Sequence, residues 1–354
     1  MSQVPLVQYA WRLIYFPAAA LFFSSAALIS IIVDLIKKLI LKNKVLPHGR
    51  AVFVTGCDSG FGNALAKRLD SKGFHVFATC LFPTGPGATE LKASCSNRLH
   101  VLYMDVTKDE SVEKALEYVK AYLGSSELWA IVNNAGIFKG FSMEMSTLDD
   151  FKDVFDVNLM GVVRVTKAFL PLLKKSKGRI VNVTSLGGKI PFPFLAAYSS
   201  SKYAAVGLTD CLRHEVGMQG ITVVSIEPEF FYTPMLYVSA LGQLNSMGSQ
   251  GSSFEDDHDD FKKSFKDLSN VATSFACLDT SIVVDDLEAA VSLVHPDHTY
   301  KPRRHALLRF SCFCYEKMPI SFQILSIKSI LFIFFSESKT LKNIVMKILS
   351  IKRK

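Results

Sequence analysis

The sequence predicts an α/β fold with a doubly wound parallel sheet, and three observations support this prediction. Short apolar, β-branched runs alternate with longer helical patterns, which is typical of parallel strands joined by helices. A glycine-rich turn at residues 55–62 links the first strand to the first helix. The chain of 354 residues, 49% of them apolar, is long enough for one large domain with appendages.

Six strands are expected in order along the chain. Each is a short run of apolar and β-branched residues, as in strands buried on both faces. These runs lie at residues 51–55, 74–79, 99–103, 128–132, 179–184 and 221–226. A weaker seventh strand is predicted near residues 305–309. The longest helical patterns cover residues 147–175 and 197–218.

A tyrosine and a lysine lie four residues apart in the second of these helices. Tyr198 and Lys202 are therefore expected on one face of a helix, one turn apart. An ammonium beside a phenol favours the phenolate, so Lys202 is expected to lower the pKa of Tyr198 from its usual value of about 10. Such a pair can donate and accept a proton near neutral pH. Taken alone, the spacing also fits a solvent-facing helical pair.

Two further motifs follow predicted strands directly. Ser185 comes after the strand at residues 179–184, and the ligand crevice of an open α/β sheet lies at the carboxyl ends of its strands. Gly56, Gly60 and Gly62 come after the first strand and before a helix. Glycines in this context permit a tight turn and a close approach of the backbone to a pyrophosphate. The sequence therefore predicts a Rossmann-like dinucleotide site.

Together, these motifs resemble the short-chain dehydrogenase/reductase family. In chain order they are Thr55-Gly56-x-x-x-Gly60-x-Gly62, Asn133-Asn134-Ala135-Gly136, Ser185 and Tyr198-x-x-x-Lys202. The resemblance covers residues 51–233 and extends more weakly to about residue 309. Gly85-Pro86-Gly87-Ala88 and Asp105-Val106-Thr107 are similar to one branch of the family. That branch holds type 2 17β-hydroxysteroid dehydrogenase, the membrane retinol dehydrogenases and mitochondrial 3-hydroxybutyrate dehydrogenase.

The resemblance implies a hydride-transfer site with four catalytic residues. Tyr198 would take the proton from an alcohol, and Lys202 would hold the pKa of Tyr198 down and bind the nicotinamide ribose. Ser185 would hydrogen-bond the reacting oxygen, and Asn158 would support a helix near Lys202. A buried asparagine at a helix kink is the other interpretation of Asn158. The implied cofactor contacts are Gly56, Asp58, Ser59, Gly60, Phe61, Gly62, Asp105, Val106, Asn133, Ala135, Gly136, Tyr198, Lys202, Pro228 and Thr233.

The cofactor is expected to be NAD rather than NADP. A 2′-phosphate calls for Arg or Lys just before Gly60 or at the end of the second strand. The chain has Asp58-Ser59 and Thr79-Cys80-Leu81 at these places. No metal site is predicted, because the acidic run with one histidine at residues 255–260 is typical of a solvated loop.

The substrate is expected to be a secondary or lipophilic alcohol, a steroid first and a retinoid second. Apolar segments at residues 191–195 and 230–236 flank Tyr198 in the sequence, although core or membrane contacts also fit them. A 3-hydroxybutyrate-type enzyme would need a cation for the substrate carboxylate, and Lys189 is the nearby candidate. Glu229 stands where the family usually has a glycine, which leaves a low-turnover dinucleotide-binding membrane scaffold as a third interpretation.

Residues 1–45 are expected to form a membrane anchor. Residues 13–33 carry no charge and are long enough to span ~30 Å of hydrocarbon as a helix. Lysines follow this run, so the catalytic domain is expected to face the cytosol, at the endoplasmic reticulum or, as the runner-up, at a mitochondrial membrane. A cleaved signal peptide is the competing interpretation. The seven cysteines, irregularly spaced, do not suggest a disulfide framework.

The dehydrogenase domain is expected to cover residues 46–310, with a polar substrate lid at residues 236–280. Residues 311–354 are expected to form an apolar and amphipathic, membrane-associated extension, in which residues 341–348 have the spacing of an interfacial helix. A helix that packs on the protein's own core is the alternative. The net charge of +8 suits anionic lipids, and no nucleic-acid motif occurs. The expected partners are a lipophilic substrate, membrane lipids and, by analogy with the family, a second copy of the chain.

Overall fold

A computed structural model describes residues 42–140, 143, 146–235 and 276–335, with scattered residues between 21 and 36. Within them, a seven-stranded sheet has the order β3-β2-β1-β4-β5-β6-β7, and every neighbouring pair is parallel. The strands are β1 (Arg50–Val54), β2 (His75–Cys80), β3 (Leu99–Tyr103), β4 (Glu127–Asn133), β5 (Arg179–Val183), β6 (Thr222–Ile226) and β7 (Thr299–Tyr300). The order reverses between β1 and β4, so the predicted doubly wound parallel sheet is confirmed.

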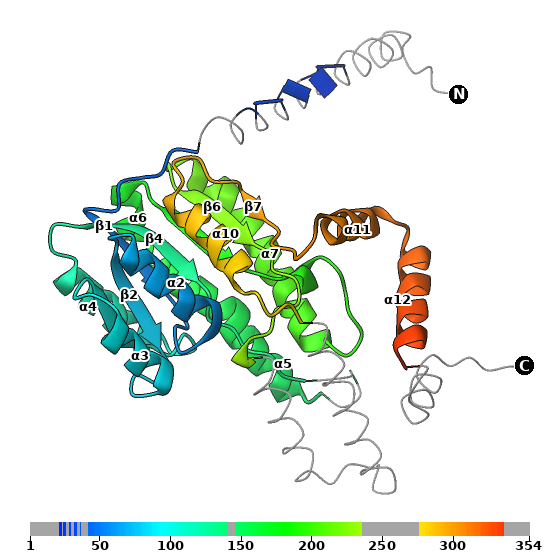
Figure 1. Cartoon of the computed structure of the whole chain (residues 1–354), viewed down its shortest axis with the longest axis horizontal. Coiled ribbons are helices and arrows are strands. Elements are labelled where there is room, and N and C mark those ends of the chain that lie inside the picture. Colours follow the sequence, from blue (N-terminus) through cyan, green and yellow to red (C-terminus); the bar gives the residue numbers. More distant parts are fainter. Residues whose placement is uncertain are drawn as a thin grey trace, which may run out of the picture. The chain divides into compact units, whose positions relative to one another are not determined.

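Helices cover both faces of the sheet (Figure 1). The helices that matter for the site and the core are α2 (Gly60–Ser71), α3 (Pro86–Ser94), α4 (Asp109–Tyr122), α5 (Leu148–Phe155), α6 (Val162–Ser176), α7 (Ala196–Gly217), α10 (Ser281–Ser292), α11 (Ala306–Lys317) and α12 (Ile320–Phe335). The core of one face includes residues of α4, α6 and α7. On the other face Arg68 of α2 forms ion pairs with Asp285 and Glu288 of α10, at 2.9 and 3.0 Å.

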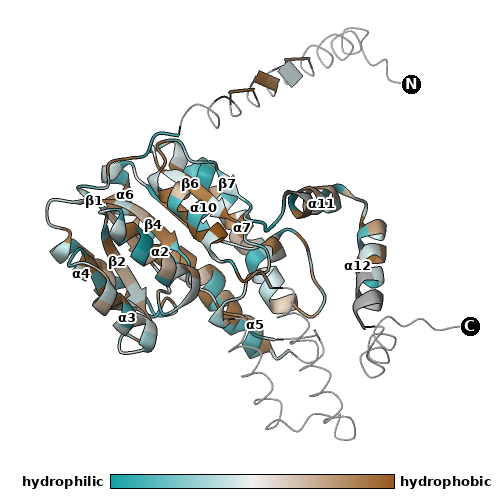
Figure 2. Ribbon diagram, viewed as in Figure 1, coloured by the Kyte–Doolittle hydropathy of each residue, from teal (hydrophilic) through white to brown (hydrophobic). Residues whose placement is uncertain are grey.

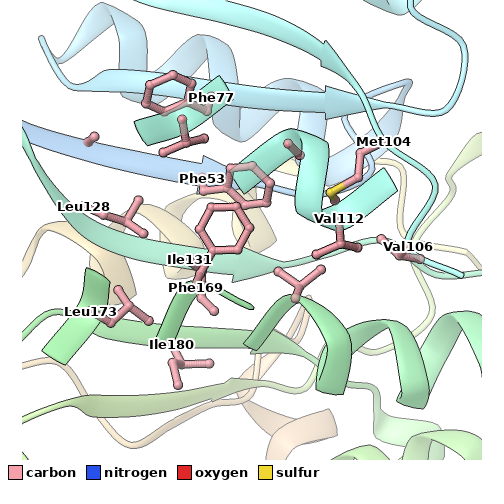
Figure 3. Close-up of a cluster of buried hydrophobic side chains, with 14 of the residues drawn as sticks. Phe53, Phe77, Met104, Val106, Val112, Leu128, Ile131, Phe169, Leu173 and Ile180 are labelled. Atoms are coloured by element: carbon pink, nitrogen blue, oxygen red, sulfur yellow. The ribbon is translucent and has the colours of Figure 1, made fainter. Parts of the chain in front are cut away.

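The central strands are apolar along their whole length because helices cover both of their faces. Phe53 of β1 contacts Phe169 of α6, with ring centroids 4.2 Å apart, and both rings are fully buried. Figure 3 shows this cluster extending to Phe77 and Ile180 on neighbouring strands. Figure 2 shows hydrophobic residues along the central strands and hydrophilic residues on the outward sides of the helices. The core therefore fixes the strands whose carboxyl ends carry the predicted site.

The long helix predicted at residues 147–175 is present, but it is interrupted. A capping box begins α5, in which Thr147 accepts from Asp150 N and the Asp150 carboxylate accepts from Thr147 N. A π-helical turn, η1 (Asp156–Gly161), then separates α5 from α6. Such π-helical turns are rare within helices and are common at functional sites. The predicted residue Asn158 lies in this turn.

The predicted seventh strand at residues 305–309 is wrong. Those residues begin α11, and the seventh strand is the short pair Thr299–Tyr300, which lies beside β6. The physical reason is residue type. Ala306, Leu307 and Leu308 favour a helix, whereas the β-branched and aromatic pair at residues 299–300 favours a strand.

Contacts divide the chain into two compact units. One comprises Met1–Val45 with Ser292–Asp297, and the other Leu46–Val291 with His298–Lys354. In the smaller unit, Lys44 forms an antiparallel bridge with Leu293, and Val45 N donates to Ser292 O at 2.7 Å. In the larger unit, α11 runs across the boundary predicted between residues 310 and 311.

The predicted anchor lies largely outside the described residues, as do the interfacial helix at 341–348 and most of the predicted lid, residues 236–275. Among the residues that the structure does describe, no helix is both long enough and apolar enough to cross a membrane.

Candidate active site

The glycine turn after β1 packs too closely to admit side chains. Gly56 has φ +68°, in the left-handed region that favours glycine, and a Cβ there would lie 2.8 Å from the Ala135 Cα. A Cβ on Gly62 would lie 2.5 Å from both Gly56 O and Asn134 Nδ2. The first turn of α2 therefore lies directly against this turn. A helix N-terminus held in this way, with its first N–H groups unpaired, is suited to bind a phosphate.

Asn134, the second residue of the motif at residues 133–136, braces this turn. Its Nδ2 donates to Thr55 O at 2.8 Å and to Gly56 O at 3.0 Å. The Thr55 hydroxyl accepts from Asn134 N and Ala135 N at 3.0 and 2.9 Å. These bonds join the loop after β1 to the loop after β4. The only sequence signal was the second asparagine in the motif at residues 133–136.

The Asn133 side chain lies inside the sheet. Its Nδ2 donates to Asn182 Oδ1 at 2.8 Å and to Thr166 Oγ1 at 3.2 Å, and Asn182 in turn donates to Thr209. The side chain therefore ties β4 to β5 and α6. The cofactor contact implied for Asn133 stays a prediction, and its side chain is already hydrogen-bonded within the sheet.

Val106 and Asp105 follow β3 at the same edge of the sheet. Val106 shares a small hollow with Thr55, Asn133 and Ala135, lined also by residues of η1 and α6. The Asp105 carboxylate accepts from Thr107 N at 2.9 Å and from the Thr107 hydroxyl at 2.8 Å, which forms a tight turn. The sheet thus brings together the predicted cofactor residues that follow β1, β3 and β4.

Asp58 supports the turn after β2. Its two carboxylate oxygens accept from Leu81 N at 2.9 Å and Phe82 N at 2.8 Å. A Cβ on Gly87 would lie 1.9 Å from Asp58 O, so α3 begins directly against this segment. Asp58 thus places a negative charge at the carboxyl end of β2.

The segment after β6 lies over the glycine turn. A Cβ on Gly60 would lie 3.7 Å from the Thr233 methyl group, and Phe61 meets Phe231 edge-on with ring centroids 5.9 Å apart. Ser59, the N-cap of α2, makes no side-chain capping bond. Thr233, Phe61 and Gly60, far apart in the sequence, are therefore neighbours in the fold.

Ser185, Tyr198 and Lys202 meet at the carboxyl end of β5. The Lys202 ammonium donates to Val183 O at 3.0 Å and lies 5.7 Å from the centre of the Tyr198 ring. Ser185 hydrogen-bonds Tyr198, and the Ser185 hydroxyl accepts from Gly187 N at 3.0 Å. The spacing in the sequence is thus realised as a contiguous serine, tyrosine and lysine cluster.

Burial decides the protonation of this cluster. It lowers the pKa of Lys202 to about 8 and raises the pKa of Tyr198, although the hydrogen bond from Ser185 opposes the second shift. The expected lowering of the Tyr198 pKa by Lys202 is therefore wrong in direction for this structure. The reason is that a low-dielectric surrounding favours the neutral form of both groups.

Asn158 is 1% exposed and ties the π-turn to the helix of Lys202. Its Oδ1 accepts from Ile137 N at 2.8 Å, and its Nδ2 donates to Ile137 O at 3.0 Å and Ser201 Oγ at 3.1 Å. A Cβ on Gly136 would lie 3.3 Å from Asn158 Oδ1 and 3.7 Å from Lys202 Nζ. Asn158 is thus both a buried residue at a helix irregularity and a neighbour of the lysine.

Glu229, which departs from the family pattern, is paired with Arg304. Its carboxylate accepts from Arg304 N and pairs with Arg304 Nε at 3.3 Å. The preceding Pro228 O accepts from Leu186 N at 2.8 Å, next to Ser185. Lys189, the candidate cation for a carboxylate substrate, lies 3.8 Å from Glu227. Both charged residues near the site therefore already have protein partners.

Comparison with known proteins gives consistent results. The family described as short chain dehydrogenase matches residues 50–241. The chain is 41% identical over 267 residues to 17-beta-hydroxysteroid dehydrogenase type 2 of Homo sapiens, which covers 73% of this chain and 68% of the relative. It is 38% identical over 273 residues to retinol dehydrogenase 7 of Rattus norvegicus, which covers 74% of this chain and 84% of the relative.

A solved structure has the same fold. It is a short chain dehydrogenase/reductase from Burkholderia phymatum in complex with NAD, with a TM-score of 0.64 and 21% identity, covering 79% of this chain and 96% of that one. The family match over more than half of the chain and the similarity to full-length relatives agree with the sheet order and the motifs. This chain belongs to the short chain dehydrogenase family.

Proposed function

We propose that this protein oxidises the hydroxyl group of a lipophilic alcohol, a steroid in the first place and a retinoid in the second, with NAD. The observation that supports this most directly is the cluster of Ser185, Tyr198 and Lys202 at the end of β5. Similarity to relatives named as a 17-beta-hydroxysteroid and a retinol dehydrogenase supports the substrate class.

The residues around the glycine turn fit a dinucleotide. The close packing at Gly56 and Gly62 leaves the backbone at the start of α2 accessible to a pyrophosphate, and Thr233 lies beside Gly60. A bound nicotinamide ring supplies the hydride acceptor. The negative charge of Asp58 at the end of β2 favours a free ribose hydroxyl over a 2′-phosphate, which supports NAD.

Tyr198 would take the proton of the alcohol, while Ser185 hydrogen-bonds the same oxygen. Because burial raises the pKa of Tyr198, the phenol is protonated at neutral pH and suited to give a proton to a carbonyl. Oxidation requires the phenolate, so its rate should rise from pH 7 towards pH 10, while the rate of carbonyl reduction, which uses the neutral phenol, should stay nearly constant over this range. Initial rates in both directions across this range, at saturating substrates, test the assignment. A rate of oxidation that falls with pH would contradict it.

Apolar side chains beside the cluster support a lipophilic substrate. Phe138 meets the Tyr198 ring edge-on at 5.5 Å, and Met235 lies near Gly136. Phe192, Phe230 and Tyr232 remain partly exposed. A hydroxy acid would instead need a free cation, and Lys189 is held by Glu227. These contacts favour the lipophilic alcohol over the 3-hydroxybutyrate alternative.

We further propose that the protein is carried at the endoplasmic reticulum membrane with its dehydrogenase domain in the cytosol. The uncharged run at residues 13–33 and the lysines after it support this orientation. Protease treatment of intact microsomes should remove the dehydrogenase domain. Protection of that domain until detergent is added would overturn the orientation.

The function is tested with detergent-solubilised full-length protein, NAD or NADP, and a panel of steroids, retinoids and short hydroxy acids. NADH formation with steroids, at a higher kcat/KM than with hydroxy acids, is the expected result. Absence of turnover with every alcohol, together with NADH binding, would instead support the low-turnover scaffold. A preference for NADP would overturn the cofactor assignment alone.

A further inference from the structure

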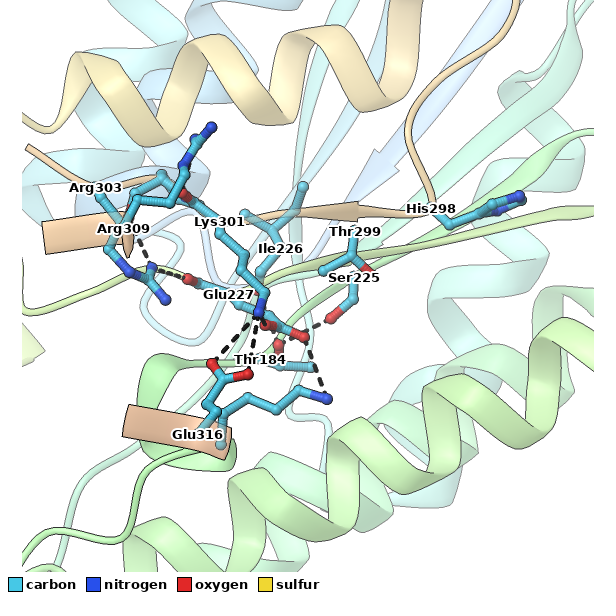
Figure 4. A network of polar contacts seen from close by, with 12 residues as sticks. Thr184, Ser225, Ile226, Glu227, His298, Thr299, Lys301, Arg303, Arg309 and Glu316 are labelled. Carbon is cyan, nitrogen blue, oxygen red and sulfur yellow. Dashed lines mark hydrogen bonds and ion pairs between the residues drawn. The ribbon is translucent and has the colours of Figure 1, made fainter. Parts of the chain in front are cut away.

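A buried carboxylate lies at the carboxyl end of β6, outside the cluster that handles the proton. Glu227 follows β6 directly and is 1% exposed. Two ammonium groups approach its carboxylate, Lys189 Nζ at 3.8 Å and Lys301 Nζ at 4.0 Å (Figure 4). Neither distance is that of a hydrogen bond, and Glu227 Oε2 has no hydrogen-bond partner. Burial raises the pKa of Glu227, and the charges of Lys189 and Lys301 oppose this shift.

The first lysine belongs to the loop that carries Ser185. A 3₁₀ turn, η2 (Leu186–Gly188), follows Ser185, and Lys189 is its C-cap. The same loop is fixed by Leu186 N, which donates to Pro228 O at 2.8 Å, and by the Tyr203 hydroxyl, which donates to Lys189 O at 2.6 Å. Through Lys189, Glu227 is thus charge-paired to a short segment that begins with Ser185.

The second lysine belongs to the segment that leads into α11. Lys301 Nζ lies 3.3 Å from both carboxylate oxygens of Glu316 on α11. Arg303 Nη1 donates to the backbone oxygen of Glu227, and Figure 4 shows these groups converging on the end of β6. Glu229, two residues on, holds Arg304. The strand end at residues 227–229 is therefore tied to residues 301–304 by several independent contacts.

Helix α11 also packs on the serine loop directly. Leu186 and Ile190 of that loop form an apolar cluster with Cys312, joined by Leu308 and Tyr315 of α11. Glu227 pairs with Lys189 of the serine loop and with Lys301, and Lys301 in turn pairs with Glu316 of α11. A change in the charge of Glu227 would therefore affect both the serine loop and α11.

We propose that Glu227 is a positioning residue of the dehydrogenase site, which rests on the proposed function. By pairing with Lys189 and Lys301 at once, it holds the loop of Ser185 against α11 and so fixes where Ser185 meets the reacting oxygen. Glu227 does not touch the reacting groups itself. Its effect passes through Ser185, whereas the glycine turn at residues 56–62 follows β1, which β4 and β5 separate from β6 in the sheet.

The test is Glu227→Gln, which removes the charge and keeps the shape of the side chain. Because small misplacements at a reacting centre are costly, kcat/KM for the alcohol should fall about tenfold to a hundredfold, while the dissociation constant of NADH stays within about twofold. The matched control is Glu288→Gln, which removes another buried carboxylate that pairs with Arg68 between α2 and α10. This control should leave kcat/KM unchanged. Glu227→Asp, which restores the charge, should recover part of the loss.

A double-mutant cycle separates positioning from a general loss of stability. In a Ser185→Ala background, Glu227→Gln should have little further effect on kcat/KM, because the group that it positions is gone. If Glu227→Gln folds poorly, Lys189→Met removes a charge partner of Glu227 instead, and its effect on kcat/KM is measured in the same two backgrounds. Equal kcat/KM for Glu227→Gln and wild type, or a loss of the same size in both backgrounds, would overturn the proposal. A wild-type protein inactive with every alcohol would instead overturn the proposed function.

Discussion

The two ends of strand β5 each meet a buried cation, and the two cations are held in different ways. At the first residue, the Arg179 guanidinium lies 4.4 Å from the centre of the Trp129 ring and donates to Ala290 O at 2.8 Å. At the last residue, Val183 O accepts from Lys202 at 3.0 Å. Arg179 is 2% exposed and Lys202 is 5% exposed, so the two cations are buried to nearly the same extent.

The two cations differ in the pKa that each has after burial. It lowers the pKa of Arg179 to about 10, so this residue stays charged at every physiological pH. It lowers the pKa of Lys202 to about 8, close to neutral pH. The amino end of the strand thus holds a permanent charge on an aromatic platform. The carboxyl end holds a charge that can change during a reaction, next to Tyr198.

The largest effect is expected at the carboxyl end, for Tyr198→Phe. Removal of the hydroxyl should lower kcat by about 10²- to 10⁴-fold, the usual contribution of a general acid or base. NADH binding should be retained, as measured by fluorescence titration. Tyr122→Phe, on α4, is the control and should leave kcat unchanged. Turnover that survives Tyr198→Phe would remove the proton-transfer role from this end of β5.

The second effect is a pH dependence of the free energy of unfolding, which distinguishes Lys202 from Arg179. The native state releases the Lys202 proton near pH 8 and the unfolded state only near 10.5, so the unfolded state binds more protons between these values. The free energy of unfolding should therefore rise with pH across this window, by about 3 kcal/mol from this group. Denaturant titrations of wild type and Lys202→Met at several pH values isolate the contribution of Lys202 to the free energy of unfolding. An identical pH dependence in both proteins would show that Lys202 is not shifted.

The third effect tests whether close packing at the carboxyl edge serves the dinucleotide. In Gly62→Ala, the new methyl group would clash with Gly56 O, so the turn must shift. We expect NADH to bind about tenfold more weakly, equivalent to about 1.4 kcal/mol. Gly207→Ala on α7 is the matched control, because a Cβ there meets nothing within 4 Å. Its NADH affinity should equal that of wild type, and a loss in both variants would refute the assignment.

The smallest effect on activity is expected at the amino end, for Arg179→Lys. The charge is kept, but the planar stack on Trp129 is lost, which should lower the free energy of unfolding by about 1–2 kcal/mol. kcat and KM should not change. Thermal unfolding together with steady-state kinetics checks both statements. A loss of kcat as large as that of Tyr198→Phe would abolish the distinction between the two ends of β5.

Sequence patterns predicted most of this arrangement because they are local. The strands β1 to β6 were recognisable from apolar runs, and Tyr198 and Lys202 from their helical spacing. The seventh strand was missed because two residues, Thr299 and Tyr300, are too short a pattern to stand out. The bracing contacts of Asn134 were not predicted, because its partners, Thr55 and Gly56, lie in the loop after another strand.

By itself, the sequence determined the fold class, the family and the residues of the serine, tyrosine and lysine cluster, since each depends on spacing along one helix or after one strand. Only the tertiary structure decided the directions of the Tyr198 and Lys202 pKa shifts, the inward turn of Asn133 and the pairing of Glu229 with Arg304. Those properties depend on which groups from distant segments surround a side chain and how far they exclude water. Burial is a sum over neighbours that no single stretch of sequence contains.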